Sequence, residues 1–289
     1  MSRTASNLSY QYNPSSITSR NAGRYVCEHM VIRSNINTIF PDTFARKNTI
    51  RTALFPDTFC SIGSRAFQKC ASLEEVHLPR HLQKLGTGVF AECPSLRKVT
   101  LPASIKEIPR EFFYADRNLS EVMIPPACRA AVIGQDAFWG CSSLSSVRLP
   151  GQLQIIRPRA FYRCKELKTV HFPPSLKQIG NYAFYFCGID SLELPDSLEY
   201  IGEAAFFKYN HLVSVTLPPS VRRIEKWVFH GCNRLKYLEI RHDPEYIGEW
   251  IINKAATIRC YKGSRVDRYC QESGFHTEYL EEPKSFSIW

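Results

Sequence analysis

The chain has 289 residues, of which 44% are hydrophobic and 12% aromatic, so it is long enough to bury a sizeable core. No run of about 18 apolar residues occurs, so no membrane-spanning helix is predicted. The formal net charge is +10, but the lysines and arginines are spread along the chain, which favours a solvated surface over a nucleic-acid-binding segment.

The first 29 residues are predicted to form a polar segment followed by a cap on the first repeat, with the cap beginning between Arg24 and Met30. Residues 1–18 lack the apolar stretch of a secretory signal. We therefore expect a cytoplasmic protein. The cell surface or secretion is the alternative, if a signal has been removed.

A repeated unit organises residues 30–253. From Leu73 the sequence reads LEEVHLPRHLQKLGTGVFAEC, and from Leu96, 23 residues later, it reads LRKVTLPASIKEIPREFFYAD. The general pattern is L-x-x-V-x-L-P-x-x-L-x-x-I-G-x-x-A-F-x-x-C, and we count about nine or ten copies. The copy that starts at Leu119 is two residues longer, through an insertion around residues 126–131. Such a fixed period predicts a solenoid.

Each part of the unit has a predicted structural role. Val76 and Leu78 are apolar and alternate with polar neighbours, which is the pattern of a half-buried strand. Pro79 ends this strand because it has no N–H to donate. Phe90 supplies the largest apolar side chain of the unit, and Cys93 behaves as a small buried hydrophobe. One unit cannot bury its apolar face alone, so stacked copies form a continuous core.

The repeated unit closely resembles the BspA-type leucine-rich repeats of bacterial and protist surface proteins. The likeness covers about three quarters of the chain. Residues 257–279, TIRCYKGSRVDRYCQESGFHTEY, are also similar to that family's C-terminal end, in which a strand, a short helix and a last strand close the solenoid. The resemblance implies a curved α/β-type solenoid with a parallel sheet on one face, a C-terminal cap at 254–282 and a tail at 283–289. It also implies binding by adhesion or protein contact.

The eleven cysteines are interpreted as packing residues. Asp116 and Tyr209 replace cysteine in the column of the repeat that holds Cys70, Cys93, Cys141, Cys164, Cys187 and Cys232. Neighbouring turns about 4.8 Å apart would permit disulfides, but these replacements favour reduced core cysteines. No C-x₂-C pair occurs, so no zinc site is predicted.

No catalytic chemistry is predicted. Phosphate-binding loops and the common hydrolase signatures are missing from the sequence. The eight histidines form no cluster with metal-ligand spacing. We therefore expect no enzyme activity, no cofactor and no metal.

Two surfaces are candidates for binding. The candidate strand face is formed by the outward residue of each strand, at His77, Thr100, Met123, Arg148, His171, Glu193, Thr216 and Glu239. Its variety suits recognition, although solvent positions without a partner also vary. The candidate aromatic edge follows the A-F pair and holds Tyr114, Trp139, Tyr162, Tyr185 and Phe207, preceded by Gln68 and Ala91 and followed by His230. Tyrosine and tryptophan are typical of interfaces. Tyrosine is also common at this position in the resembling family, and the rings have neighbouring repeats to pack against.

These observations predict a non-enzymatic scaffold that binds a protein partner. One alternative is an adhesin for host matrix or glycan. Another is an anionic partner, nucleic acid or lipid, bound by basic surface, of which the richest stretch holds Arg148, Arg157, Arg159, Arg163, Lys165 and Lys168. Nucleic acid is the less favoured partner, and its binding would weaken steeply with salt.

Overall fold

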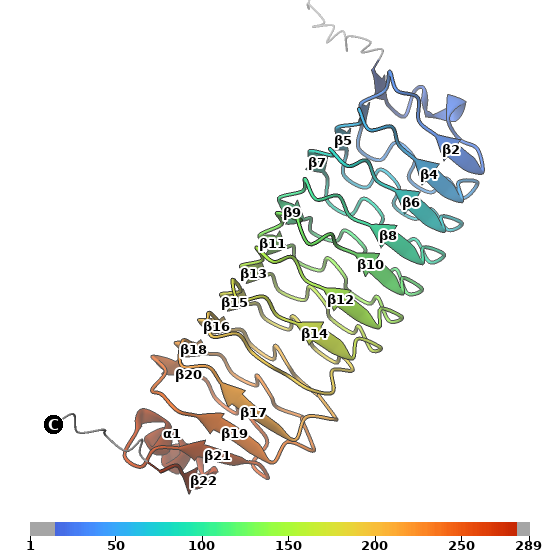
Figure 1. Cartoon of the computed structure of the whole chain (residues 1–289). Helices are drawn as coiled ribbons and strands as arrows, with labels where there is room; N and C mark the ends of the chain where they lie inside the picture. The colour runs from blue at the N-terminus through green and yellow to red at the C-terminus, as the bar shows by residue number, and fades with distance from the viewer. Residues whose placement is uncertain (1–14, 282–289) are drawn as a thin grey trace, which may run out of the picture.

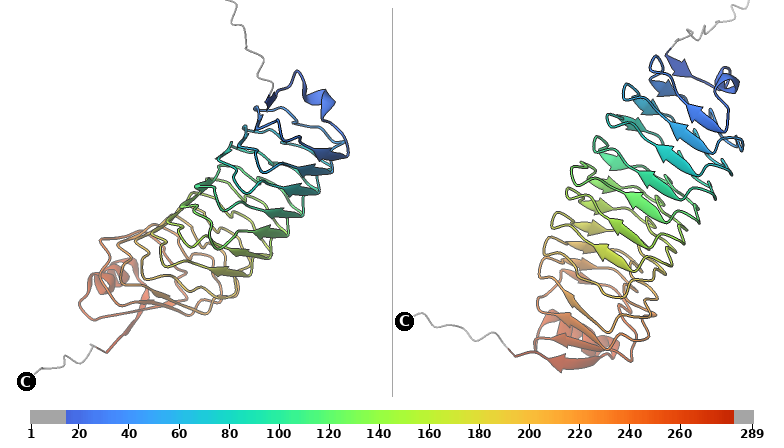
Figure 2. Two further views of the ribbon diagram at one scale, coloured as in Figure 1. Left: turned by 45° about the horizontal axis from the view of Figure 1, so that its top comes forward. Right: turned by 45° about the vertical axis from the view of Figure 1, so that its right-hand side comes forward.

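The chain winds into an elongated solenoid whose turns stack along one axis, as seen in the computed structural model, which describes residues 15–281 (Figure 1). The first and last described turns lie at opposite ends of this body in all three views (Figure 2). The polar segment and the tail predicted at the two termini fall largely on residues 1–14 and 282–289, outside the described residues. The repeat solenoid expected from the sequence is confirmed.

One side of each turn is a short strand in which a buried residue lies between two more exposed ones. These strands form the strand column: β2 (His29–Val31), β4 (Thr52–Leu54), β6 (Glu75–His77), β8 (Lys98–Thr100), β10 (Glu121–Met123), β12 (Ser146–Arg148), β14 (Thr169–His171), β17 (Ser214–Leu217), β19 (Tyr237–Ile240) and β21 (Thr257–Cys260). Pairing is parallel and without offset, so that Val76 of β6 lies beside Val99 of β8. Equivalent residues of successive turns therefore form straight rows.

A second column of two-residue strands follows the first, and the sequence analysis described this part of the unit only as a turn. It consists of β1 (Ser16–Ile17), β3 (Thr38–Ile39), β5 (Ser61–Ile62), β7 (Lys84–Leu85), β9 (Glu107–Ile108), β11 (Val132–Ile133), β13 (Ile155–Ile156), β15 (Gln178–Ile179), β16 (Tyr200–Ile201), β18 (Arg223–Ile224) and β20 (Tyr246–Ile247). These strands are also parallel, with Ile133 beside Ile156 and Ile156 beside Ile179. The solenoid thus has parallel sheets on two sides.

The third side, which we call the turn face, consists of stacked turns that carry the A-F pair. Its backbone also bonds from turn to turn, since the N–H groups of Arg65, Phe67 and Lys69 donate to carbonyls of the next turn at 2.8–2.9 Å. Two residues of each turn have positive φ. The first left-handed column contains Asp42, Arg65, Gly88, Glu111, Asp136, Arg159, Tyr182, Ala204, Trp227 and Trp250, and the second contains Arg46, Lys69, Glu92, Ala115, Gly140, Arg163, Phe186, Lys208 and Gly231.

Phenylalanine rings stack inside the turn face, one from each turn. Phe138, Phe161 and Phe184 are fully buried, and neighbouring ring centroids lie 4.8 and 5.0 Å apart with the rings almost parallel. Burying a side chain of this size contributes about 1.5–3 kcal/mol, so the row is a main source of stability. It forms because a phenylalanine, preceded by alanine in five of the units, recurs at the same place from Phe44 to Phe229.

The cysteine column lies behind this row, and its thiols satisfy buried carbonyl groups. Cys164 Sγ donates to the carbonyl oxygen of Phe138 at 3.1 Å, and the same bond joins each of the other five column cysteines to a phenylalanine of an earlier turn. All six are free thiols. The Tyr209 hydroxyl replaces a thiol and donates to the Phe184 carbonyl at 2.9 Å. The column is therefore a packing and hydrogen-bonding element.

Two irregular turns interrupt the strand column. Eight residues separate β10 from β11, whereas six separate β6 from β7, so the insertion lies where the sequence placed it. The turn that contains Glu193 contributes no strand to the strand column, which passes from β14 to β17. A Cβ on Gly188, in this shortened turn, would lie 2.3 Å from the Lys165 carbonyl oxygen, so this position leaves no room for a side chain.

The C-terminal end has the strand, short helix and last strand that the resemblance implied. They are β21, α1 (Arg265–Ser273) and β22 (His276–Tyr279), which pairs in parallel with β21. The Ser264 hydroxyl caps α1 by accepting the Asp267 N–H at 3.1 Å, and Gly274 ends it with φ of 67°. Helix within residues 15–281 is confined to α1 and the 3₁₀ turn η1 (Ala22–Arg24), both at the ends, and neither could cross a membrane. The repeats themselves are strand and turn.

Candidate binding surfaces

The strand face predicted from the sequence is a row of exposed side chains along the strand column. Register places His77 beside Thr100, Thr100 beside Met123, and Arg148 beside His171. Thr216 of β17 is exposed, whereas Glu239 of β19 is half-buried and bonded to Arg241 at 2.6 Å. Strand pairing therefore joins the candidates in three groups, on β6–β10, on β12–β14 and on β17–β19.

The strand face differs from the prediction in two places, at Glu193 and at the N-terminal end. Glu193 is exposed, but it lies outside any strand. It lines a hollow of about 260 Å³ together with His171 and Phe172. At the N-terminal end the row continues through Val31 and Leu54, which lie side by side and are 60% and 47% exposed. The sequence did not indicate these two residues because their repeats match the general pattern only in part.

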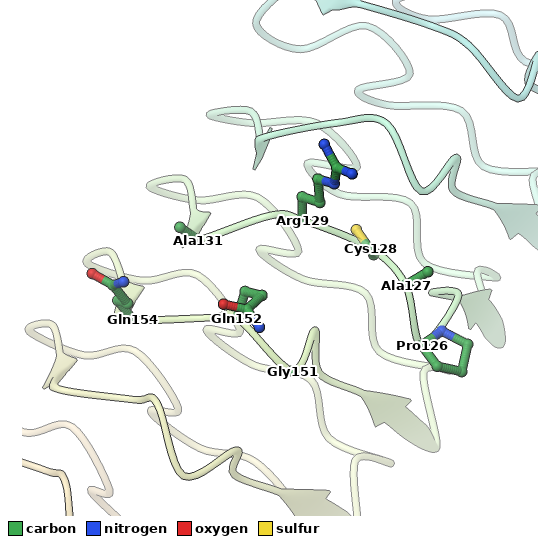
Figure 3. Close-up of a pocket in the computed structure, with 8 residues that line it drawn as sticks. All are labelled: Pro126, Ala127, Cys128, Arg129, Ala131, Gly151, Gln152 and Gln154. Carbon is green, nitrogen blue, oxygen red and sulfur yellow. The ribbon is translucent and has the colours of Figure 1, made fainter.

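A further hollow lies over the insertion. Figure 3 shows that it lies between two neighbouring turns; its volume is about 490 Å³ and its lining residues are Pro126, Ala127, Cys128, Arg129, Ala131, Gly151, Gln152 and Gln154. A neighbouring hollow of about 680 Å³ shares Ala127 and Arg129 and extends to Arg80 and His81. The inserted residues therefore lie between two shallow hollows. In the sequence, the two extra residues of the repeat that starts at Leu119 indicated this irregularity.

The aromatic edge is a continuous stack of rings on the turn face, here called the aromatic ladder (Tyr114, Trp139, Tyr162, Tyr185 and Phe207). Successive centroids are 4.6, 5.9, 4.8 and 5.0 Å apart, and successive ring planes differ by 6–12°. His230 extends the stack at 5.7 Å with a tilt of 34°. The ladder begins at Tyr114 because the preceding turns carry Ala91 and Gln68 in this row.

The stacking decides which part of each ring meets solvent. All five ladder rings are half-buried. Each inner ring is covered on both faces by its neighbours, so its exposed part is the edge, including the Tyr162 and Tyr185 hydroxyls. Packing between repeats and exposure to a partner therefore occur together in this row. Stacked pairs of this kind contribute about 0.5–1.5 kcal/mol beyond the area they bury, which makes the ladder rigid.

Large apolar side chains flank the C-terminal half of the ladder. Phe186, Trp227 and Trp250 are 37%, 37% and 45% exposed. All three have positive φ and belong to the left-handed columns of the turn face. Sequence analysis did not include them because these columns contain many residue types, and only the backbone geometry brings them to the ladder.

The cysteine column contains one buried carboxyl group. Asp116 is fully buried, and burial raises its pKa well above the usual value for aspartate. Burial also raises the pKa of Cys70 to about 11 and that of Cys232 to about 12. These thiols stay protonated at neutral pH and are poor nucleophiles.

No metal centre is found within residues 15–281, where no three His, Cys, Asp or Glu side chains are grouped so that they could hold an ion. The surfaces described above are formed by hydroxyls, ring edges, charged side chains and apolar groups. Such groups suit recognition.

Comparison with known proteins agrees with this geometry. A family model described as BspA type leucine-rich repeat region, with six copies, matches residues 23–141 and 131–259. A search of curated proteins found no match.

Among solved structures, a leucine-rich repeat protein from Bacteroides ovatus is 22% identical with a TM-score of 0.57, covering 86% of this chain and 77% of its own. A leucine-rich cell surface protein from Faecalibacterium prausnitzii is 19% identical with a TM-score of 0.52, covering 93% and 83%. Because the family match spans most of the solenoid, the chain belongs to the BspA-type leucine-rich repeat family.

Proposed function

We propose that this chain is a non-enzymatic scaffold that binds a protein partner through the turn face, centred on the aromatic ladder. The observation that carries the proposal is the parallel stack from Tyr114 to Phe207, which holds five ring edges in one row. Tyrosine and tryptophan give large contact area at low conformational cost. Rings already fixed by stacking lose little further freedom on binding.

The stacking favours a protein over a glycan or nucleic acid. A sugar ring or a base packs on the face of an aromatic side chain. Inner ladder faces are covered by neighbouring rings, with Trp139 lying between Tyr114 and Tyr162. The exposed edges and hydroxyls suit the mixed polar and apolar contacts of a protein interface.

Where the partner is found depends on the cellular location of this chain, which is a separate prediction. The sequence predicts a cytoplasmic protein, with the cell surface as the alternative. The name of the Faecalibacterium prausnitzii protein places that protein at a cell surface, which supports the alternative. A matrix protein bound at the surface would use the same ladder edges, so the adhesin proposal differs from the scaffold proposal in location and not in mechanism.

Affinity capture from the source cells tests the proposed surface. The wild type is compared with a variant that combines Trp139→Ala, Tyr162→Ala and Tyr185→Ala. The matched control combines His77→Ala, Thr100→Ala and Met123→Ala on the strand face. Thermal unfolding of all three proteins establishes that each is folded at the capture temperature.

The proposal expects a specific protein that the wild type and the strand-face variant capture and the ladder variant loses. Loss only in the strand-face variant would move the binding site to the strand face. Equal capture by all three proteins would reject both surfaces.

A further inference from the structure

The C-terminal half of the turn face carries cations that lie over aromatic rings. Arg163 lies 5.5 Å from the Tyr162 ring centroid, Lys165 lies 5.8 Å from that of Phe186, and Lys208 lies 5.7 Å from that of Phe207. The next two turns repeat the arrangement, with Lys226 over Trp227 at 4.5 Å and Lys254 over Trp250 at 5.1 Å. These distances are within the range of cation–π attraction.

Three of the four cations that the left-handed columns carry from Asp42 to Arg159 are paired with carboxylates. Arg65 pairs with Asp42 at 2.9 Å, and Lys69 pairs with Glu92 at 3.4 Å. Arg159 pairs with Asp136 at 2.8 Å in the middle of the solenoid. In each pair, the carboxylate comes from the neighbouring turn. Arg65, Lys69 and Arg159 are thus held by acidic side chains one turn away, whereas Arg46 of the second left-handed column has no carboxylate within 4.0 Å among the described residues.

The pairing stops beyond Arg159. Within the described residues, Arg163, Lys165 and Lys208 have no carboxylate within 4.0 Å. In the second left-handed column, Lys208 is flanked by Phe186 and Gly231, so neither neighbour can supply the carboxylate that Glu92 supplies to Lys69. Two further cations are partly engaged, since Lys226 lies 3.8 Å from Glu203 and Lys254 donates to the Ser273 carbonyl at 2.8 Å.

We propose that this basic aromatic patch (Arg163, Lys165, Phe186, Lys208, Trp227 and Trp250) binds an acidic segment of the partner protein. The inference rests on the proposed function and specifies the chemistry of the partner. Carboxylates of the segment take the positions beside Arg163, Lys165 and Lys208 that Asp42 and Glu92 occupy in the N-terminal half. Its apolar side chains cover Phe186, Trp227 and Trp250. Such an arrangement follows the charge complementarity of protein interfaces.

An acidic polypeptide fits this patch better than nucleic acid. Single-stranded nucleic acid gains affinity by stacking bases on open aromatic faces. Here the Phe207 ring stacks on Tyr185 at 5.0 Å and faces His230 on its other side at 5.7 Å. The same cations also stand over rings of the patch, so bases find few free faces. The carboxylates of an acidic segment need only the cations of the patch and no open ring face.

Fluorescence anisotropy with a short labelled peptide tests the proposal. The probe alternates glutamate with leucine, and its control replaces every glutamate by glutamine. Single-stranded DNA and vesicles of phosphatidylserine in phosphatidylcholine are tested in the same buffer. The variant combines Arg163→Ala and Lys208→Ala.

The matched control variant combines Arg46→Ala and Lys69→Ala. These residues occupy the same column with the same backbone conformation, and Ala115 shows that alanine is accepted there with φ of 61°. Both variants lose two positive charges, so a difference between them reports the place of the charge and not its amount. The backbone N–H bonds of all four positions to the next turn do not involve the side chains.

The expected result is binding of the glutamate peptide that weakens about tenfold in the Arg163→Ala/Lys208→Ala variant and changes by less than about twofold in the control variant. Equal loss in both variants would overturn the proposal, because non-specific attraction to net charge explains it. Equal binding of the glutamine peptide would also overturn it. Stronger binding of DNA or of the vesicles, lost in the same variant, would replace the acidic segment by a phosphate-bearing partner.

The outcome is separable from that of the proposed function. If capture yields a partner that depends on the ladder but the glutamate peptide does not bind, the scaffold function stands and the acidic segment is rejected. If the peptide binds at the patch but capture is independent of the ladder, the patch is retained and the ladder is rejected as the site.

Discussion

The carboxyl group of Asp116 accepts the backbone N–H of Cys93 through Oδ1 at 2.7 Å, while its buried Oδ2 has no hydrogen-bond partner within the described residues. Asp116 stands in the column where cysteines donate to phenylalanine carbonyls. A protonated carboxyl group has the O–H needed for the same role, whereas an ionised one places a charge in the core. Burial raises the pKa accordingly.

We expect Asp116→Cys to stabilise the protein at neutral pH. Because the folded-state pKa is raised, Asp116 binds its proton more tightly in the folded than in the unfolded chain. Stability is therefore lost as the pH rises above the unfolded value of about 3.9. The gain should be about 1–3 kcal/mol at pH 7 and should shrink as the pH falls towards the unfolded value. Urea unfolding over this pH range measures it. A gain independent of pH would reject a protonated Asp116.

Tyr209→Phe tests the hydrogen bonds of the cysteine column. The substitution keeps the ring and removes the hydroxyl that donates to the Phe184 carbonyl at 2.9 Å. The Phe184 carbonyl keeps the Cys187 N–H at 3.3 Å, so the variant loses one hydrogen bond worth about 0.5–1.5 kcal/mol, and urea unfolding should show this loss. Tyr162→Phe is the matched control, since its ring lies in the half-buried ladder. An unchanged unfolding midpoint for Tyr209→Phe would mean that the hydroxyl only fills space.

Thiol reactivity should separate the cysteines by burial. Cys27 is exposed and Cys60 is half-buried, whereas the column cysteines are buried, and burial raises the pKa of Cys70 to about 11 and that of Cys232 to about 12. We expect Cys27 to react fast with a disulfide reagent at pH 8 and the column only on unfolding, because the thiolate is the nucleophile. Mass spectrometry of the labelled peptides identifies the sites. Fast labelling of Cys164 in the folded protein would contradict the packing role.

Substitutions of Lys69 test the left-handed backbone of the turn face, because this residue has a φ of 60°. We expect Lys69→Val to cost about 1–2 kcal/mol more than Lys69→Gly, because a left-handed conformation is strained for a residue with a branched Cβ. Both variants lose the 3.4 Å ion pair with Glu92, so that loss cancels in the comparison. Thermal or urea unfolding measures the difference. Equal stability of the two variants would show that the turn relaxes.

The repeated unit predicted the fold because one signal recurs many times. The A-F pair and the cysteine column define rows of identical contacts, and parallel stacking without offset follows once each unit is too small to bury itself. The same logic placed Trp139 and Tyr162 in one row. That the rings stack face to face also depends on side-chain torsion angles, and a sequence pattern does not determine these.

The left-handed columns escaped prediction for a physical reason. Positive φ is usually signalled by glycine, but in these columns glycine stands only at Gly88, Gly140 and Gly231. The other members are charged, aromatic or small residues, and hydrogen bonds from turn to turn hold the strained conformation, as between the Arg163 N–H and the Tyr185 carbonyl at 2.8 Å. Exposed side chains such as Trp227 therefore take their places on the turn face without a local signal.

Successive turns stack without offset, so the length of each row of side chains is set by the number of repeat units. Because every turn meets only the turns before and after it, duplication of one unit lengthens each row by one residue and introduces no new type of contact. The aromatic ladder lengthens by one ring and the rows of charge by one position, about 4.8 Å at a time. Selection for a longer or shorter partner therefore needs only a change in the number of units, with the chemistry of each row left intact.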